Sequence, residues 1–392
     1  MSEVKGHWKA RWEPVVESFR QNIREAGEEA AALTVYRAGK PVIRLWAGES
    51  TPGTPWQENT RVNLFSASKG VVALAVLQLV EAGHLSLDQP VSDLWPAFAQ
   101  AGKQDITVRM LLSHRSGLSA LQERAPEAAI FDWNDMTARV EAARPWWTPD
   151  SAQGYSPFLF GWALGEVVRR AAGVERFSDW VETSIARPLG LGLTFGAAGD
   201  APVADSRPLK RGLGLPSNGA DSQSLGKIMK ADPRGVTNQA FSNPVSLLTA
   251  SNSEAWRAAE IPAANGYASA TDLAAIYGAL ANGGQAANAR LLSEDMIALC
   301  AQELTFEDDR VLGLPLRFGH GFMLSQKRDD CRFGRGRGAF GHPGAGGCLG
   351  FADPDYGIGF GYVTGRMGPS LLIDSRPQRL IDALYTVLGD TL

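Results

Sequence analysis

The chain contains little cysteine, no long apolar run and no excess of charge of either sign. The three cysteines, Cys300, Cys331 and Cys348, are widely spaced, which argues against a disulfide framework or a zinc site. Charged residues make up 20% of the 392 residues and the net charge is -4, so a nucleic-acid partner is not expected. No segment offers about 20 uncharged apolar residues, and the first residues lack the apolar core of a signal peptide. We therefore expect a cytoplasmic protein without a membrane partner.

Strand and helix patterns occur at both ends of the chain. Residues 33–37 and 42–46 alternate around a turn and predict a hairpin. Residues 347–351 and 358–363 predict two more strands, and residues 376–388 predict a closing helix. The pattern between these ends is mainly helical. This order predicts a discontinuous fold in which both ends of the chain build one sheet.

We expect an α/β (α+β) architecture with an antiparallel sheet, flanked by N- and C-terminal helices, and a separate all-helical lobe. The sheet lobe is assigned to residues 1–75 and 255–392, and the helical lobe to residues 76–254. Residues 205–254 lack clear periodicity and are rich in Gly, Pro, Ser and Asn, which is typical of an irregular pocket wall. A cleft between the lobes is the expected pocket.

A serine and a lysine lie three residues apart, at Ser66 and Lys69, where a helix begins. Positions i and i+3 share a helix face, so the Lys69 amine can reach the Ser66 oxygen and accept its proton. The apolar run over residues 71–80 predicts a buried helix, and burial lowers the pKa of a lysine. The pattern is typical of a serine nucleophile that needs no histidine. The alternative is a serine helix cap beside a solvent-exposed lysine.

Two further positions are candidates for the same site. Tyr155 heads a loop before a predicted helix, where a neighbouring ammonium would lower the pKa of the phenol; core or surface packing is the alternative. His342 lies in a glycine-rich strand that a ligand could approach closely, or in a glycine-laden turn. His114 fits a packing role better than a catalytic one. A Gly-x-Ser-x-Gly motif is absent from the sequence, which counts against an α/β-hydrolase.

In this order, the motifs resemble those of the serine β-lactamase and penicillin-binding-protein superfamily. The nucleophile motif is matched by Ser66-Ala67-Ser68-Lys69. Tyr155-Ser156-Pro157 stands where the family has Tyr-x-Asn, and His342-Pro343-Gly344 stands where it has Lys-Thr-Gly or His-Thr-Gly. The branch that the chain resembles most holds the class C β-lactamases, the D-alanyl-D-alanine carboxypeptidases and the family VIII carboxylesterases.

The resemblance implies a β-lactamase-like fold and a role for each motif. Ser66 would attack a carbonyl carbon, Lys69 and Tyr155 would share the proton relay, and water would hydrolyse the acyl-enzyme. Whether Lys69 or Tyr155 accepts the proton in each step stays open. The mechanism implied by the family needs no metal or cofactor.

The resemblance also implies how the substrate would be held. The backbone N–H groups of Ser66 and Ala345 would form the oxyanion hole. His342 and Gly344 would line the substrate side.

Three departures from the family pattern bear on the substrate. Pro157 replaces an asparagine that would hold a substrate amide, and Pro343 removes a threonine hydroxyl. His342 replaces a fixed cation that would attract a carboxylate. We therefore expect a serine carboxylesterase for small, short-acyl esters. A β-lactamase or D-amino-acid-specific peptidase or amidase is one alternative, and a non-catalytic ligand-binding or sensor protein is another. The oligomeric state is left open.

Overall fold

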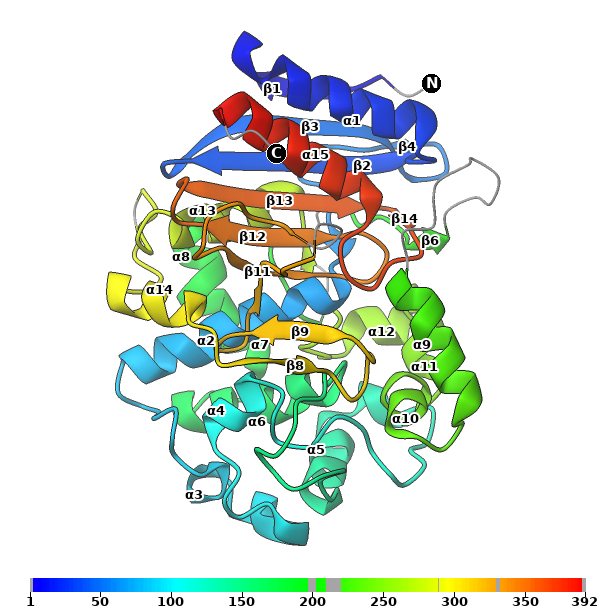
Figure 1. Cartoon of the computed structure of the whole chain (residues 1–392), viewed down its shortest axis with the longest axis vertical. Coiled ribbons are helices and arrows are strands. Elements are labelled where there is room, and N and C mark those ends of the chain that lie inside the picture. The colour runs from blue at the N-terminus through cyan, green and yellow to red at the C-terminus, as the bar shows by residue number, and fades with distance from the viewer. Residues whose placement is uncertain (1–2, 197–201, 209–219, 288, 329–331, 390–392) are drawn as a thin grey trace.

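The computed structural model describes residues 3–196, 202–208, 220–287, 289–328 and 332–389, and its largest element is an antiparallel sheet (Figure 1). Neighbouring strands follow the order β1-β3-β2-β13-β12-β11-β10-β9-β8, with β4 beside β3. These strands are β1 (Lys5–Trp8), β2 (Ala30–Arg37), β3 (Lys40–Thr51), β4 (Thr54–Pro55), β8 (Thr305–Asp308), β9 (Pro315–Phe318), β10 (Met323–Leu324), β11 (Phe340–Pro343), β12 (Leu349–Asp353) and β13 (Ile358–Thr364). Their pairings are antiparallel, as predicted from the strand patterns.

The two ends of the chain meet in the middle of this sheet. β2 pairs with β13, so that Leu33 lies opposite Tyr362 and Val35 opposite Phe360. Side chains on both strands are buried, which gives these strands the apolar sequence of a sheet covered on both faces. The sheet is therefore complete only when segments more than 300 residues apart in the sequence have paired.

Helices cover the sheet and fill the lower part of the molecule in Figure 1. They are α1 (Glu13–Glu25), α2 (Lys69–Glu81), α3 (Val91–Leu94), α4 (Val108–Leu112), α5 (Trp133–Ala142), α6 (Leu159–Ala172), α7 (Phe177–Val181), α8 (Arg187–Leu189), α9 (Ala220–Ala231), α10 (Val236–Ser242), α11 (Ser246–Thr249), α12 (Glu254–Ala258), α13 (Ala270–Leu280), α14 (Glu294–Ala301) and α15 (Ser375–Leu388). Shorter helical turns are η1 (Ala10–Trp12), η2 (Phe65–Ser68), η3 (Pro96–Gly102), η4 (Ala129–Phe131) and η5 (Glu182–Ala186). Two small sheets join β5 (Val62–Asn63) to β7 (Tyr267–Ala268) and β6 (Arg207–Pro208) to β14 (Arg366–Met367).

The faces of the sheet are covered by different helices. α1 and α15 pack together over one face, where Figure 1 shows them in blue and red. α13 packs on the other face against β13 and β2. A Cβ at Gly359 or Gly361 would lie 2.1 or 2.4 Å from α13 backbone atoms, so only glycine allows this close approach. The predicted flanking of the sheet by N- and C-terminal helices is therefore confirmed.

The structure of residues 205–254 differs in part from the prediction. α9, α10 and α11 lie within residues 205–254 and α12 begins at residue 254, so the segment contains helices that its sequence pattern did not indicate. Tertiary packing of Phe241, Leu247 and Trp256, which are buried, stabilises helices too short to show a sequence period. The division at residues 75 and 254 stays a prediction. Among the described residues, no helix is long and apolar enough to cross a membrane.

Candidate active site

Ser66 and Lys69 lie together at the start of the buried helix α2. The chain enters from β5, passes Phe65 with a φ of 48°, and continues through η2 into α2. A positive φ strains a phenylalanine backbone, and such strain is common where a structure fixes a functional group. The Lys69 Nζ lies 3.0 Å from the Ser66 Oγ. The sequence spacing thus brings the predicted pair into hydrogen-bond contact.

Lys69 has no exposure to solvent and no carboxylate among its hydrogen-bond partners. Its Nζ donates to the backbone carbonyls of Pro157, at 2.7 Å, and Ala263, at 3.1 Å. Burial lowers the pKa of Lys69 well below its ordinary value, because the ammonium is poorly solvated there. The lysine of this pair is therefore suited to accept a proton near neutral pH.

Tyr155 reaches the same point from the loop before α6. Tyr155 and Ser66 line the same cavity, and the centre of the Tyr155 ring is 4.9 Å from the Lys69 Nζ. Burial raises the pKa of Tyr155, and the contact with Ser66 offsets only part of this effect. The expected lowering of the pKa was therefore wrong, because Lys69 is itself too buried to supply a stable positive charge.

A buried carboxylate that the sequence did not point to holds the Tyr155 backbone. The Asp309 Oδ2 accepts hydrogen bonds from the Tyr155 amide at 2.7 Å and from the Gln153 side chain at 3.1 Å. The other carboxylate oxygen accepts from the amides of Val311 and Leu312. Asp309 follows β8 in the sequence, and no local pattern shows that it reaches a residue more than 150 positions earlier.

His114 has the packing role that its sequence context predicts. Its ring lies 5.0 Å from the rings of Tyr155 and Phe160 and 4.7 Å from that of Phe318. Its Nδ1 accepts a hydrogen bond from the Ser156 amide at 3.2 Å. Burial lowers the pKa of His114 well below its ordinary value, so the ring is neutral. His114 therefore supports the loop of Tyr155 through a ring contact and a hydrogen bond.

The glycine-rich strand β11 forms the opposite side of the site. His342 is buried, its ring centre lies 6.1 Å from that of Tyr155, and its Nδ1 lies 2.7 Å from the Pro343 carbonyl. Burial and the nearby Lys69 lower the pKa of His342 to about 3. This position therefore carries no positive charge at neutral pH, in line with the expected loss of the family's fixed cation.

Gly344 lies where β11 approaches the chain that leads to Ser66. A Cβ at Gly344 would be 2.2 Å from the Leu64 carbonyl, so this glycine lets β11 pack against the chain that leads to Ser66. It is not among the cavity-lining residues, whereas the adjacent Ala345 is. The contact of Gly344 with the substrate side stays a prediction.

Ala345 lies in a tight turn that faces Ser66 across the cavity. The Gly344 amide donates to the Cys348 carbonyl at 2.6 Å, and the Gly347 amide donates to the Gly344 carbonyl at 3.1 Å, which closes the turn. In the described part of the chain, the Ala345 amide donates to no backbone carbonyl. Ser66 and Ala345 line the same cavity, as an oxyanion hole requires.

The cavity has a volume of about 130 Å³ and mainly apolar walls. Polar side chains on it come from Ser66, Tyr155 and His342. The remaining described residues that line it are Phe65, Pro157, Phe158, Phe241, Leu247, Leu248, Ala264, Leu312, Met323, Pro343, Ala345, Met367, Leu371 and Leu372. None of these lining residues is Asp, Glu, Lys or Arg, so the described walls carry no fixed charge.

Comparison with known proteins places this site in a family. The sequence model of the Beta-lactamase family matches residues 19–384. The chain belongs to the beta-lactamase family. Within it, the chain is 30% identical to the esterase/beta-lactamase LipL of Mycobacterium tuberculosis over 380 residues, which covers 95% of this chain and 85% of LipL.

Solved structures of the same family share the whole fold. A penicillin-binding-protein homologue from Caulobacter crescentus is 35% identical, with a TM-score of 0.86 over 98% of this chain and 100% of the homologue. A family VIII carboxylesterase is 32% identical, with a TM-score of 0.88 over the same shares of the two chains. The predicted family, the β-lactamase-like fold and the prediction of an enzyme are thereby confirmed.

Proposed function

We propose that the protein is a serine carboxylesterase that hydrolyses small, uncharged esters through an acyl-enzyme on Ser66. The observation that carries the proposal is a buried lysine without a carboxylate partner, in contact with a serine that opens into an apolar cavity. The similarity to a family VIII carboxylesterase and to an esterase/beta-lactamase supports it.

The hydrogen bonds of Lys69 bear on whether its amine donates a hydrogen bond to Ser66 or accepts one from it. A neutral amine has two N–H groups and one lone pair. The carbonyls of Pro157 and Ala263 can only accept, so they take the two N–H groups. The lone pair is then left for the Ser66 hydroxyl, which supports Lys69 as the base for acylation.

Acylation follows from this arrangement. The Ser66 Oγ forms a bond to the ester carbonyl carbon while its proton passes to the Lys69 Nζ. The carbonyl oxygen becomes an oxyanion and accepts hydrogen bonds from the Ser66 and Ala345 amides. When the carbon–oxygen bond to the alcohol breaks, Tyr155 gives its proton to the leaving alkoxide and takes the proton held by Lys69.

Deacylation reverses these roles. Water attacks the acyl carbon and loses a proton to the relay of Tyr155 and Lys69, and the proton returns to the Ser66 Oγ as the acid leaves. The apolar walls favour an uncharged acyl group, and the cavity of about 130 Å³ favours a short one. The cytoplasmic location inferred from the sequence stays a prediction.

Turnover of p-nitrophenyl acetate by the wild type, Ser66→Ala, Lys69→Ala and Tyr155→Phe tests the proposal. We expect Ser66→Ala to lose at least about 10³-fold in kcat, because it removes the nucleophile. Ser92→Ala, which removes an exposed hydroxyl bonded to the Gln104 carbonyl, is the matched control. Unchanged turnover by Ser66→Ala would sink the proposal. A stable acyl adduct without turnover in the wild type would favour the sensor alternative.

A β-lactamase is the second candidate, because LipL carries both activities in its name. His342 is neutral, so it cannot attract a β-lactam carboxylate by charge. Pro157 has no side-chain amide to hydrogen bond with the amide of a β-lactam side chain. We therefore expect nitrocefin to be a poorer substrate than p-nitrophenyl acetate. Comparable kcat/KM values for the two substrates would reverse this order of preference.

A further inference from the structure

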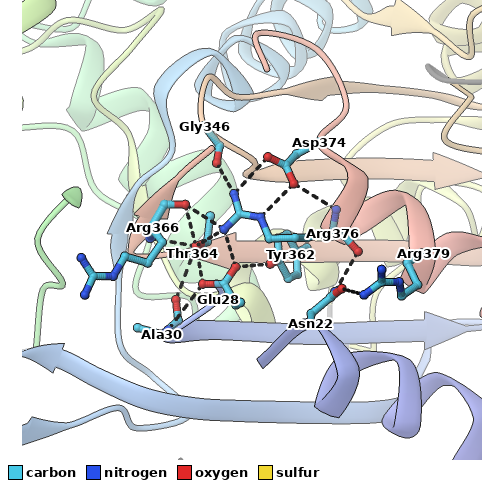
Figure 2. Close-up of polar contacts among 10 residues, drawn as sticks. All are labelled: Asn22, Glu28, Ala30, Gly346, Tyr362, Thr364, Arg366, Asp374, Arg376 and Arg379. Carbon is cyan, nitrogen blue, oxygen red and sulfur yellow. Dashed lines mark hydrogen bonds and ion pairs between the residues drawn. The ribbon is translucent and has the colours of Figure 1, made fainter. Parts of the chain in front are cut away.

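A buried ionic cluster contacts Gly346, the residue that follows Ala345 (Figure 2). Its centre is Arg376, in the first turn of α15, which has no exposure to solvent. The guanidinium pairs with Glu28 at 2.7 Å and with Asp374 at 2.8 Å. The Glu28 carboxylate also accepts from the hydroxyls of Tyr362, at 2.5 Å, and Thr364, at 2.9 Å.

Arg376 uses its remaining N–H groups on backbone carbonyls. Its Nη2 donates to the Gly346 carbonyl at 2.7 Å, and its Nη1 donates to the Arg366 carbonyl at 2.9 Å. Figure 2 shows these bonds fanning out from one guanidinium to separate parts of the chain. The planar, five-donor head of arginine can hold these directions at once, which a lysine ammonium cannot.

Gly346 is the residue after Ala345, and it is fixed on all sides. Its carbonyl also accepts from the Gly368 amide at 2.8 Å, and its own amide donates to the Ser370 carbonyl at 3.0 Å. A rotation of the Ala345–Gly346 segment would break these bonds together. The Gly346 carbonyl shares a peptide plane with the Gly347 amide, which donates to the Gly344 carbonyl at 3.1 Å. That carbonyl shares its own peptide plane with the Ala345 amide. The orientation of the Ala345 amide is therefore linked to the Gly346 carbonyl and, through it, to Arg376.

The same guanidinium organises one wall of the cavity. Arg366 and Asp374, which both contact it, bracket the segment that contains Met367, Leu371 and Leu372, and these three side chains line the cavity. The oxyanion turn and this apolar wall thus share one buried anchor.

Packing alone does not require the charged groups of this cluster. An apolar side chain of similar size would fill the space without the free-energy cost of burying a cation and two carboxylates. It could not hold carbonyl groups in fixed directions. The ionic cluster thus supplies orientation rather than volume, and the orientation is passed to the residue next to Ala345.

We propose that Arg376 is a positioning residue for the oxyanion hole, holding the Ala345 amide toward Ser66 through the Gly346 carbonyl. The inference rests on the proposed function, since it concerns the ester carbonyl that Ser66 attacks. Arg376 does not contact the substrate; Glu28 and Asp374 fix the guanidinium so that it points at the turn.

Matched oxygen and sulfur esters separate positioning from general structural damage. The proposed substrates are p-nitrophenyl acetate and its thiono analogue, in which sulfur replaces the carbonyl oxygen. Sulfur is a weak hydrogen-bond acceptor, so the thiono ester gains little from the oxyanion amides. Loss of amide orientation should slow the oxygen ester more than the sulfur ester.

The variants are Arg376→Lys, which keeps the charge but loses the fork, and Glu28→Gln, which keeps the size and the bond to Tyr362. Removal of an oxyanion donor typically costs about 10²–10³-fold in kcat, so we expect a displaced donor to cost about 10-fold in Arg376→Lys. The thiono ester should lose clearly less, with KM for the oxygen ester little changed. Glu28→Gln should shift the ratio of the two rates in the same direction and by less.

Glu166→Gln is the matched control, because Glu166 is buried and pairs with Arg169 and Arg170 on α6, away from the cavity. It should leave the ratio of the two rates unchanged. Equal losses for both esters in folded Arg376→Lys and Glu28→Gln would overturn the inference; if Arg376→Lys does not fold, Glu28→Gln and Asp374→Asn decide it by the same ratio. A wild type whose ester turnover does not depend on Ser66 would instead overturn the proposed function.

Discussion

Lys69 and Arg376 are both basic side chains without exposure to solvent, and they occupy opposite electrostatic surroundings. Lys69 contacts a hydroxyl and two carbonyls, whereas Arg376 contacts two carboxylates. Burial therefore lowers the pKa of Lys69, while Glu28 and Asp374 outweigh burial and raise the pKa of Arg376. The pKa of one buried basic group is thus lowered, as the proposed proton transfer requires, and the pKa of the other is raised, so that Arg376 stays charged.

The comparison predicts its largest effect for removal of the lysine amine. Lys69→Met keeps the length and apolar stem, so we expect kcat for p-nitrophenyl acetate to fall about 10²–10⁴-fold from the loss of general-base catalysis. Lys103→Met is the matched control, since Lys103 is also buried against backbone carbonyls but lies in the helical part of the chain. If both variants lose activity equally, Lys69 is not a special base.

The reverse behaviour is predicted for stability. Arg376→Met leaves Glu28 and Asp374 buried without a cation, so we expect the free energy of unfolding in urea to fall by about 3–5 kcal/mol. Lys69→Met should not lose stability, because it removes a group that is poorly solvated when charged. A larger loss of stability in Lys69→Met than in Arg376→Met would contradict this assignment of roles.

The pH dependence sharpens the contrast. The pKa of Lys69 is lowered in the folded protein, so kcat/KM should stay level down to a lower pH than the ordinary pKa of a lysine allows, and decline only below that folded pKa. The unfolded chain binds the Lys69 proton up to a higher pH, so the stability penalty of burying this lysine should shrink as pH rises toward about 10.4. The stability difference between Lys69→Met and wild type should therefore grow as pH falls from about 10.4 and level off below the folded pKa of Lys69.

His342 should not contribute to that pH profile. Its pKa of about 3 leaves the ring neutral across the working range, so His342→Gln should keep the acidic limb of kcat/KM at the same pH. A limb that moves in His342→Gln but stays in place in Lys69→Met would assign the titration to the histidine instead.

The smallest predicted effect concerns substrate choice. Pro157→Asn adds an amide at the cavity while the backbone carbonyl that accepts from Lys69 can remain. One new hydrogen bond is typically worth about 0.5–1.5 kcal/mol, so we expect the ratio of nitrocefin to p-nitrophenyl acetate kcat/KM to rise about 2–10-fold. An unchanged ratio would show that the missing amide does not set the preference.

The part of this site that follows a local pattern could be predicted from the sequence. Ser66 and Lys69 are one helical turn apart. Tyr155 and His342 each begin a short sequence motif that resembles one of the family's motifs. Arg376 and Glu28 are 348 positions apart, and Asp309 reaches Tyr155 across 154 positions. Such contacts exist only after the sheet has formed, so no spacing in the sequence reveals them.

The errors have the same origin. The pKa of Tyr155 depends on how deeply its phenol is buried, and the short helices α10 to α12 depend on the packing of the buried Phe241, Leu247 and Trp256. These are properties of assembled layers, whereas the motifs are properties of single segments.

The pairing of β2 with β13 also sets when the enzyme can first act. During synthesis, Ser66 and Lys69 leave the ribosome long before β11, the Ala345 turn and Arg376 exist. If the proposed function holds, a nascent chain carries the proposed nucleophile without the proposed oxyanion hole, and we expect ester cleavage to begin only after the last strand has joined the first ones.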